Sequence, residues 1–101
     1  MTTYTIYATD SFKKLFSALD RSEQIWIEKI KSQLEQNPAG KILTFSWFRE
    51  KRYLNKRLFF LIDEEGKKIL LVSFASKKDQ QEVIDFIKSN MKEFLKYLKR
   101  F

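Results

Sequence analysis

Hydrophobic residues change their spacing near residue 42 of this chain, and the change predicts where helices give way to strands. The segment 4–7 reads as a short strand, because aromatic and β-branched residues fill it. Two helices should follow, since apolar residues then recur every three or four positions. Thr9 or Asp10 can cap the first helix, and Asp20 with Glu23 is spaced as in a capping box that opens the second. The apolar positions of these helices are Phe12, Leu15, Phe16, Leu19, Trp26, Ile27, Ile30 and Leu34.

Beyond residue 42 the spacing becomes that of strands. Leu43, Phe45 and Trp47 alternate with polar residues, which predicts one strand from Ile42 through Tyr53. Two near-continuous apolar runs follow, as expected for central strands that helices cover. These runs are Leu58–Ile62 and Ile69–Ala75.

Short polar segments connect the predicted strands and lead into a last helix. The segments 53–56 and 64–67 are the expected hairpin connections, and Gly66 is suited to the positive φ angle of a turn. The last helix should begin near Lys78 or Asp79 and run towards the C-terminus. Its apolar stripe is Val83, Ile87, Asn90 or Met91, Phe94 and Leu98.

The predicted order is therefore an N-terminal strand, a two-helix hairpin, a three-stranded antiparallel meander and a C-terminal helix. This order indicates an α+β fold, in which the helical pair packs on one face of a mostly antiparallel sheet. We expect a single domain, residues 1–101, because a chain of this length buries roughly two-thirds of its unfolded surface in one modest core.

Composition narrows the possible chemistry. Twenty Lys and Arg residues against 13 Asp and Glu give a net charge of +7, which favours nucleic acid, anionic lipid or an acidic protein as the partner. The chain has no histidine, so Ser-His-Asp triads and histidine-ligated zinc sites are excluded. It has no cysteine, which fits the cytoplasm. No apolar run approaches the roughly 18 residues of a membrane span, so no membrane partner is expected.

Basic residues gather at the ends of the predicted strands. Arg49 and Lys51 are two positions apart on one strand, so their side chains leave the same face. Arg57 begins the next strand across a short hairpin and is expected to join them on that face, while Lys77 and Lys78 come from the end of the third strand. Together they can form a concave surface for an anion. The alternative is a set of solvated charges that protect the sheet from edge pairing.

Such a set can promote metal-free RNA cleavage. The ribose 2′-hydroxyl attacks the adjacent phosphorus, and the transition state carries extra negative charge that guanidinium and ammonium groups stabilise. A lysine whose pKa is lowered by neighbouring cations is one candidate base. No cofactor and no metal is required for this chemistry.

Three segments carry a resemblance to a known family: the run 49–52 (REKR), the pair Lys56-Arg57 before the central strand, and the run 77–81 (KKDQQ) after the last one. They resemble the RelE branch of the RelE/ParE toxin superfamily, and archaeal members in particular. The resemblance implies the same order of elements. It also implies a ribosome-dependent mRNA endoribonuclease, the toxin of a type II toxin–antitoxin system, with an acidic RelB-like antitoxin, the ribosome and mRNA as its partners.

Site residues follow from this resemblance. Arg49, Lys51, Arg57 and Lys78 match the family's catalytic cations, and Arg57 is expected to hold the scissile phosphate without contributing much to folding. Ile84 stands where the family has a tyrosine, so the general acid or base is not identified. The expected contacts to RNA or the ribosome are Lys41, Arg52, Lys56, Lys77, Gln80 and Gln81.

Several alternatives remain open at the level of sequence. The chain can instead be a ParE-like toxin that inhibits DNA gyrase by binding, or a RelE-like protein that no longer cleaves. Gln80 and Gln81 can be polar caps of the last helix, which itself can be a membrane-surface helix. Five aromatic residues can be stacking platforms for nucleotides or, more simply, core residues. These are Trp47, Phe48, Phe59, Phe60 and Phe74.

Overall fold

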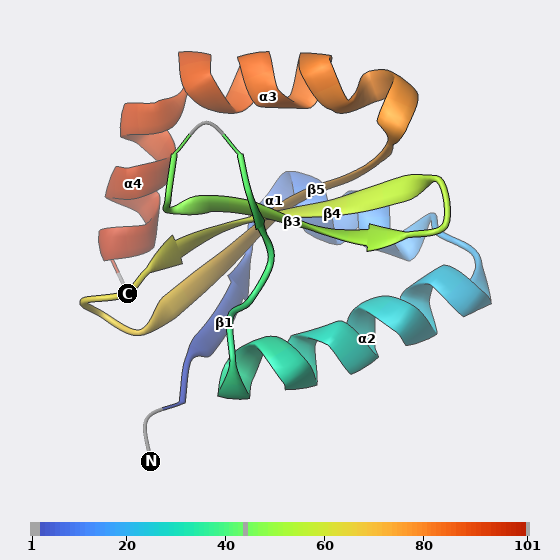
Figure 1. The fold of residues 1–101 in the computed structure, drawn as a ribbon, viewed down its shortest axis with the longest axis horizontal. Helices are drawn as coiled ribbons and strands as arrows, with labels where there is room; N and C mark the ends of the chain where they lie inside the picture. The colour runs from blue at the N-terminus through green and yellow to red at the C-terminus, as the bar shows by residue number, and fades with distance from the viewer. Residues whose placement is uncertain (1–2, 44, 101) are drawn as a thin grey trace.

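The computed structural model describes residues 3–43 and 45–100, which form a five-stranded sheet with helices on both faces (Figure 1). In chain order the elements are β1 (Thr5–Ala8), α1 (Asp10–Ser17), α2 (Arg21–Gln36), β2 (Lys41–Ile42), β3 (Phe48–Tyr53), β4 (Lys56–Asp63), β5 (Lys68–Ser76), the 3₁₀-helix η1 (Lys77–Asp79), α3 (Gln80–Ser89) and α4 (Met91–Lys99). Within the described residues, no helix is long and apolar enough to cross a membrane.

The sheet has the strand order β1-β5-β4-β3-β2. Only the β1–β5 pair is parallel; β2–β3, β3–β4 and β4–β5 are antiparallel. The α+β prediction is therefore confirmed, with the meander β3–β4–β5 at its centre. Both predicted hairpin connections of the meander are also present, since β3 ends at Tyr53 and β4 begins at Lys56, while β5 follows at Lys68.

Two hydrophobic cores lie on opposite faces of the sheet, because side chains alternate along each strand. Phe60 of β4 belongs to the core beneath α1 and α2, and the adjacent Phe59 belongs to the core beneath α3 and α4. Both rings are fully buried, so truncation of either to alanine is expected to cost about 3–5 kcal/mol. Phe48 and Phe74 are buried as well, which assigns these aromatic residues to the cores rather than to nucleotide stacking.

Both predicted helix caps are present. The Thr9 hydroxyl accepts a hydrogen bond of 3.0 Å from the Phe12 amide. The Asp20 carboxylate accepts one of 2.8 Å from the Glu23 amide, and the Glu23 carboxylate accepts in turn from the Asp20 amide, which completes the capping box. These bonds satisfy amide groups that the first turn of a helix leaves without partners.

The Asp20 cap makes stability depend on pH. Hydrogen bonds from the Glu23 amide and the Ser22 hydroxyl lower the pKa of Asp20 below its usual value of 3.8. Because this folded-state pKa is depressed, the charged form stabilises the fold above about pH 4, and this contribution is lost as the pH falls through the folded-state pKa. Asp20→Asn keeps a capping oxygen but no charge. Urea unfolding should therefore show the wild type more stable at pH 7 and the difference shrinking at acidic pH. A difference that stays constant down to pH 2.5 would contradict this.

The predicted strand over residues 42–53 is wrong, because β2 ends at Ile42 and β3 begins only at Phe48. The chain turns between them: the Leu43 amide donates to the Phe48 carbonyl, and the Phe48 amide donates to the Phe45 carbonyl. Leu43, Phe45 and Trp47 all pack against the core beneath α3 and α4 from this turn. Their alternation thus reflects one shared core rather than a strand.

Gly66 lies in a hairpin turn as predicted, but it does not have the positive φ angle that was the reason for the prediction. No described glycine has a positive φ; in the two hairpin turns that angle belongs to Lys67 (φ 55°) and Leu54 (φ 54°). The Gly66 amide instead donates to the Asp63 carboxylate, and a Cβ atom there would lie 2.6 Å from an oxygen of that side chain, which would have to shift.

The single C-terminal helix of the prediction is two helices, α3 and α4, which meet at Asn90. At the end of α3, the Asn90 amide is shared between the carbonyls of Phe86 and Ile87, and its side chain also donates to the Phe86 carbonyl. A straight helix of this length would extend about 30 Å. The bend instead lets Ile87 of α3 and Leu98 of α4 both reach the same core (Figure 1).

Candidate functional site

The β3–β4 hairpin divides its cations between the two faces of the sheet. Directly opposed residues of an antiparallel pair share a face, and the register pairs Arg52 with Arg57 and Lys51 with Leu58. Leu58 lies in the core beneath α1 and α2, so Lys51 and Arg49 point to that side. Arg57 points to the side of α3. The prediction that Arg57 joins Arg49 and Lys51 on one face is therefore wrong. The two-residue turn places Arg57 across from Arg52, so its side chain lies on the other face of the sheet.

Arg57 lies in a polar cluster that three elements build beneath the start of α3. Its side chain is 10% exposed, and its Nε atom lies 3.8 Å from Oε1 of Glu50, a β3 residue that is itself 5% exposed. Gln80 is the first residue of α3, and its side-chain amide donates a 2.8 Å hydrogen bond to Oε2 of the same carboxylate. Arg57 was expected to contribute little to folding because it begins a strand, but its side chain is buried and charge-paired.

Exposed cations surround this cluster at the same end of the sheet. Arg52 follows Glu50 on the same face of β3, and its Nε donates to the Leu54 carbonyl in the hairpin turn. Lys77 and Lys78 lie in η1, which the Lys77 amide ties to Asn55 of that turn. We call Arg52, Lys77 and Lys78 the cationic rim. None of the three has an ion pair within the described part of the chain.

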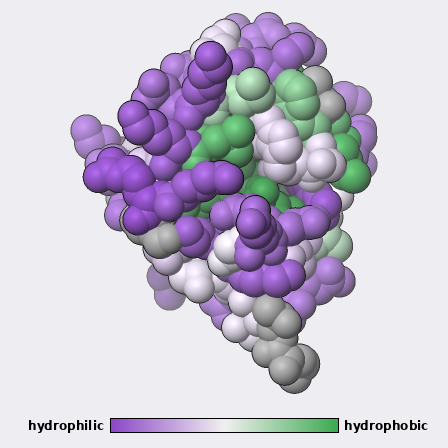
Figure 2. Space-filling view, turned by 90° about the vertical axis from the view of Figure 1, so that its left-hand side faces the viewer, coloured by the Kyte–Doolittle hydropathy of each residue, from purple (hydrophilic) through white to green (hydrophobic). Residues whose placement is uncertain are grey.

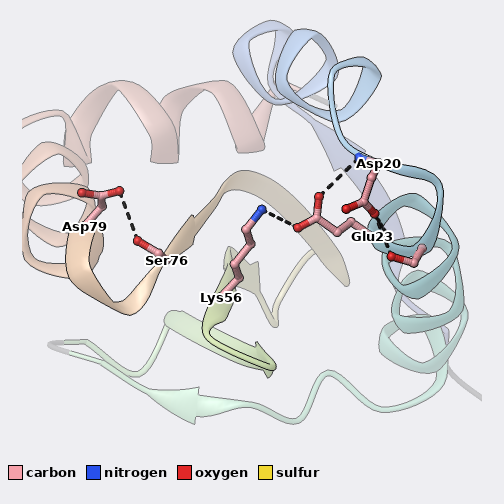
Figure 3. Close-up of polar contacts among 6 residues, drawn as sticks. Asp20, Glu23, Lys56, Ser76 and Asp79 are labelled. Atoms are coloured by element: carbon pink, nitrogen blue, oxygen red, sulfur yellow. Dashed lines mark hydrogen bonds and ion pairs between the residues drawn. The ribbon is translucent and has the colours of Figure 1, made fainter.

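On the opposite face, structural contacts occupy two of the predicted site residues. Lys56 extends from the start of β4 to an ion pair with Glu23 of α2 (Figure 3), and its ammonium lies 5.4 Å from the centre of the Phe74 ring. Arg49 donates to the carbonyls of Ser46 and Pro38, each at 3.0 Å, and pairs with Glu64 at 3.4 Å. These groups hold α2 and two loops against the sheet.

The remaining predicted residues lie apart from the Arg57 cluster. Lys51 is half-buried and faces a shallow hollow beside the C-terminal end of α2, and Lys41 is exposed on β2. Gln81 is exposed and donates to Asp85 within α3. Of the ten predicted residues, the structure thus brings together five, which are Arg52, Arg57, Lys77, Lys78 and Gln80.

Two features of the cluster bear on acid–base chemistry. Ile84, at the position expected for a tyrosine, is half-buried against the core beneath α3 and carries no titratable group. Tyr53 packs against Trp26 with ring centres 4.8 Å apart and ring planes tilted by 35°, on the face of the sheet opposite to Arg57. The carboxylate at the cluster is Glu50, which our reading of the sequence missed. The available signal was its place on β3: Glu50 lies two residues before Arg52, and Arg52 lies directly across the hairpin from Arg57.

Away from the Arg57 cluster, the surface carries a pocket beside α4. No group of three or more His, Cys, Asp or Glu side chains is placed to hold a metal ion in the segments that the structure describes. The face that carries α4 has apolar side chains gathered in a hollow and surrounded by hydrophilic ones (Figure 2). This pocket, between α4 and the turn at residues 45–47, has apolar and charged lining residues, which are Ser46, Trp47, Ile62, Asp63, Glu64, Leu95, Leu98 and Lys99.

Comparisons with known proteins identify solved structures that share this fold. No protein-family model matches the chain, and no curated sequence matches it significantly. Among solved structures, a mutant of the Escherichia coli toxin RelE in the free state superposes with a TM-score of 0.70 at 14% identity, covering 85% of this chain and 99% of that one.

Two further matches are toxin–antitoxin complexes. The RelBE2 complex of Mycobacterium tuberculosis gives a TM-score of 0.64 at 21% identity, with 75% of this chain and 100% of the other covered. The archaeal RelE–RelB complex from Pyrococcus horikoshii OT3 gives 0.65 at 14% identity, with 75% and 97% covered. Likeness at these identities shows a shared fold.

Proposed function

We propose that this chain, which has a RelE-type toxin fold, is the toxin of a type II toxin–antitoxin pair and cuts mRNA on the ribosome. The observation that carries the proposal is the guanidinium of Arg57 set among the exposed cations of the rim, at one end of the sheet. Its partners would be mRNA, the ribosome and an acidic, RelB-like antitoxin, and its place of action would be the cytoplasm. Two of the matched structures are complexes of such a toxin with its antitoxin, which supports the pairing.

The cations supply electrostatic stabilisation in this proposal. When the 2′-hydroxyl attacks phosphorus, charge builds up on the phosphate oxygens, and donors already fixed in place stabilise it at little reorganisation cost. Arg57 is fixed by its burial and Arg52 by its bond to the hairpin turn. Lys78 and Lys77 would contact the flanking phosphates. Lys51, on the other side of the sheet, would contact ribosomal RNA instead, whereas Arg49 is held by its structural contacts.

Dependence on the ribosome follows from what the cluster does not contain. The described residues offer no tyrosine or histidine beside Arg57, and the nearest carboxylate, Glu50, is paired. A site with weak acid–base assistance relies on accurate positioning of the 2′-hydroxyl in line with the leaving oxygen. The ribosome would supply this positioning for mRNA in its decoding site, so free RNA should be a poor substrate.

A second candidate is a toxin that binds its target without cleaving. The Glu50–Arg57 pair favours it, because a buried carboxylate offsets the charge of the central arginine, and Ile84 favours it further. Such a protein would either block translation while leaving mRNA intact or bind another target, such as DNA gyrase.

A cell-free translation reaction separates these candidates. Added protein should stop synthesis, and primer extension on the mRNA should show new ends inside the reading frame, within codons held by the ribosome. Arrest with intact mRNA would support the non-cleaving candidate. Unimpeded translation together with inhibited DNA gyrase would support the gyrase reading.

The rim gives a specific prediction for this reaction. Neutralising all three of its cations (Arg52→Gln, Lys77→Gln and Lys78→Gln) should reduce cleavage at least about tenfold, because several charge-assisted contacts are removed. Folding should change little, since the side chains are exposed. The matched control neutralises three exposed lysines elsewhere, Lys88, Lys92 and Lys96, and so changes the net charge equally. Equal loss in both variants would show that only net charge matters.

A further inference from the structure

Glu50 is the feature of the cluster that the proposed function does not use. Carboxylates are rarely buried without a partner, and Glu50 is 5% exposed in the middle of a basic surface. Its two oxygens have different partners: Oε1 faces the Arg57 guanidinium at 3.8 Å, and Oε2 accepts from the Gln80 amide at 2.8 Å. One cationic donor and one neutral donor thus converge on one anion.

The donors around Glu50 are those that bind a phosphate. Guanidinium and amide N–H groups donate to carboxylate and phosphate oxygens with similar geometry. Gln80 is also the first residue of α3, a ten-residue helix, whose dipole favours negative charge at this end. A carboxylate therefore occupies a position that would suit an RNA phosphate.

The Arg57 guanidinium also retains a free donor. Its Nη1 donates to the Lys56 carbonyl and its Nε faces Glu50, while Nη2 has no hydrogen bond to any described residue. Among the described residues no buried side-chain nitrogen or oxygen lacks a partner, so Nη2 is not sealed from solvent. This donor is therefore available to an anion, which would compete with Glu50 for the rest of the group.

A displaced carboxylate would have another cation within reach. Arg52 follows Glu50 by two residues on the same face of β3, which separates the two Cα atoms by about 7 Å. The Arg52 side chain is exposed and has no ion pair with any described residue. The Glu50 side chain, with three rotatable bonds, can turn from Arg57 towards Arg52 without leaving its charge unpaired.

We propose that Glu50 is a resident counter-anion, which occupies the phosphate position at Arg57 and Gln80 until an RNA phosphodiester displaces it. The inference rests on the proposed function for the identity of the ligand. It gives a physical reason for dependence on the ribosome: free RNA offers too few contacts to displace a paired carboxylate. A ribosome-held strand, positioned by many contacts, presents its phosphate at high local concentration. Glu50 thus keeps a +7 protein from engaging phosphates indiscriminately.

Anion binding without RNA or ribosomes tests this directly. Inorganic phosphate, and separately a trinucleotide with 2′-O-methyl groups that cannot be cut, would be titrated into the full-length protein and followed by NMR. Glu50→Gln should bind both about tenfold more tightly than wild type, because the competing charge is gone while the side chain keeps its shape. The control Glu82→Gln, an exposed residue of α3, makes the same change in net charge and should alter affinity less than about twofold.

The double variant Glu50→Gln/Arg57→Gln locates the gain. It should lose the extra affinity, and a gain that persists in it would overturn the proposal, as would a folded Glu50→Gln protein with wild-type affinity. If Glu50→Gln fails to fold, Glu50→Asp decides the question. This variant keeps a charge beside Arg57 but shortens the side chain by one methylene, which withdraws the carboxylate from the phosphate position and should raise phosphate affinity about threefold. An unchanged affinity in folded Glu50→Asp would then refute the inference.

The proposed function and the counter-anion role of Glu50 can be refuted separately. Tighter phosphate binding by Glu50→Gln, together with no cleavage of ribosome-bound mRNA, would refute the proposed function and leave the counter-anion in place. Cleavage by the wild type, with no gain in Glu50→Gln, would refute the counter-anion alone.

Discussion

Arg57→Ala should destabilise the protein by about 3–5 kcal/mol, because it leaves the Glu50 carboxylate buried without its cation. Loss of cleavage should accompany this, by roughly a hundredfold, since a contact to the developing charge of the transition state is removed. Urea unfolding followed by circular dichroism measures the first effect. The second is measured as the rate of mRNA cleavage at a temperature where the variant is still folded.

A double-mutant cycle separates the ion pair from the arginine itself. Replacing both charges (Glu50→Gln with Arg57→Ala) should cost less stability than Arg57→Ala alone, because no buried charge is then left unpaired. Arg57→Lys should recover little cleavage, since an ammonium cannot reproduce the planar guanidinium. An Arg57→Ala protein as stable as the wild type, or one that cleaves at the wild-type rate, would contradict the assignment.

Binding of the antitoxin should depend on salt through its association rate. We expect the acidic protein from a neighbouring reading frame to associate with this chain about tenfold more slowly, or more slowly still, at 150 mM salt than at about 20 mM, because screening removes the long-range attraction of a +7 surface. Dissociation should change less than about twofold, since apolar contacts set the lifetime of the complex. Stopped-flow fluorescence of Trp26 and Trp47 can follow both rates.

The variant that lacks the cationic rim provides the control for this experiment. It should associate more slowly than the wild type at low salt and show a shallower dependence on salt. Association that ignores salt in the wild type would contradict electrostatic steering. A purified chain with no affinity for any neighbouring acidic product would contradict the toxin–antitoxin pairing itself.

Local features of the fold were predictable because they depend on a few adjacent residues. The Asp20–Glu23 capping box and the turn at Leu54-Asn55 are present as the sequence indicates. Long apolar runs also placed β4 and β5 correctly. The physical cause of each feature is local. It is a cap, a turn or burial on both faces, and it depends on residues within the same segment.

Features that depend on distant contacts were not predictable in the same way. Leu43, Phe45 and Trp47 alternate with polar residues as in a strand because their side chains share one core with α3 and α4. The face on which Arg57 lies depends on the exact length of a hairpin, and an error of one residue moves a side chain to the opposite face. Glu50 was missed because its partner Gln80 is 30 residues away and meets it only after β5 and α3 have packed.

The most direct test of the proposed activity compares one mRNA in two states. A 5′-labelled message would be incubated with the purified protein, either free or in ribosome complexes stalled with an empty decoding site, and cut ends would be counted over time. The account predicts rapid cleavage at the codon in that site and cleavage of the free message at least about a hundredfold slower, because only the ribosome positions the phosphate at Arg57. Equal rates on free and ribosome-bound RNA, or no cleavage of either, would contradict it.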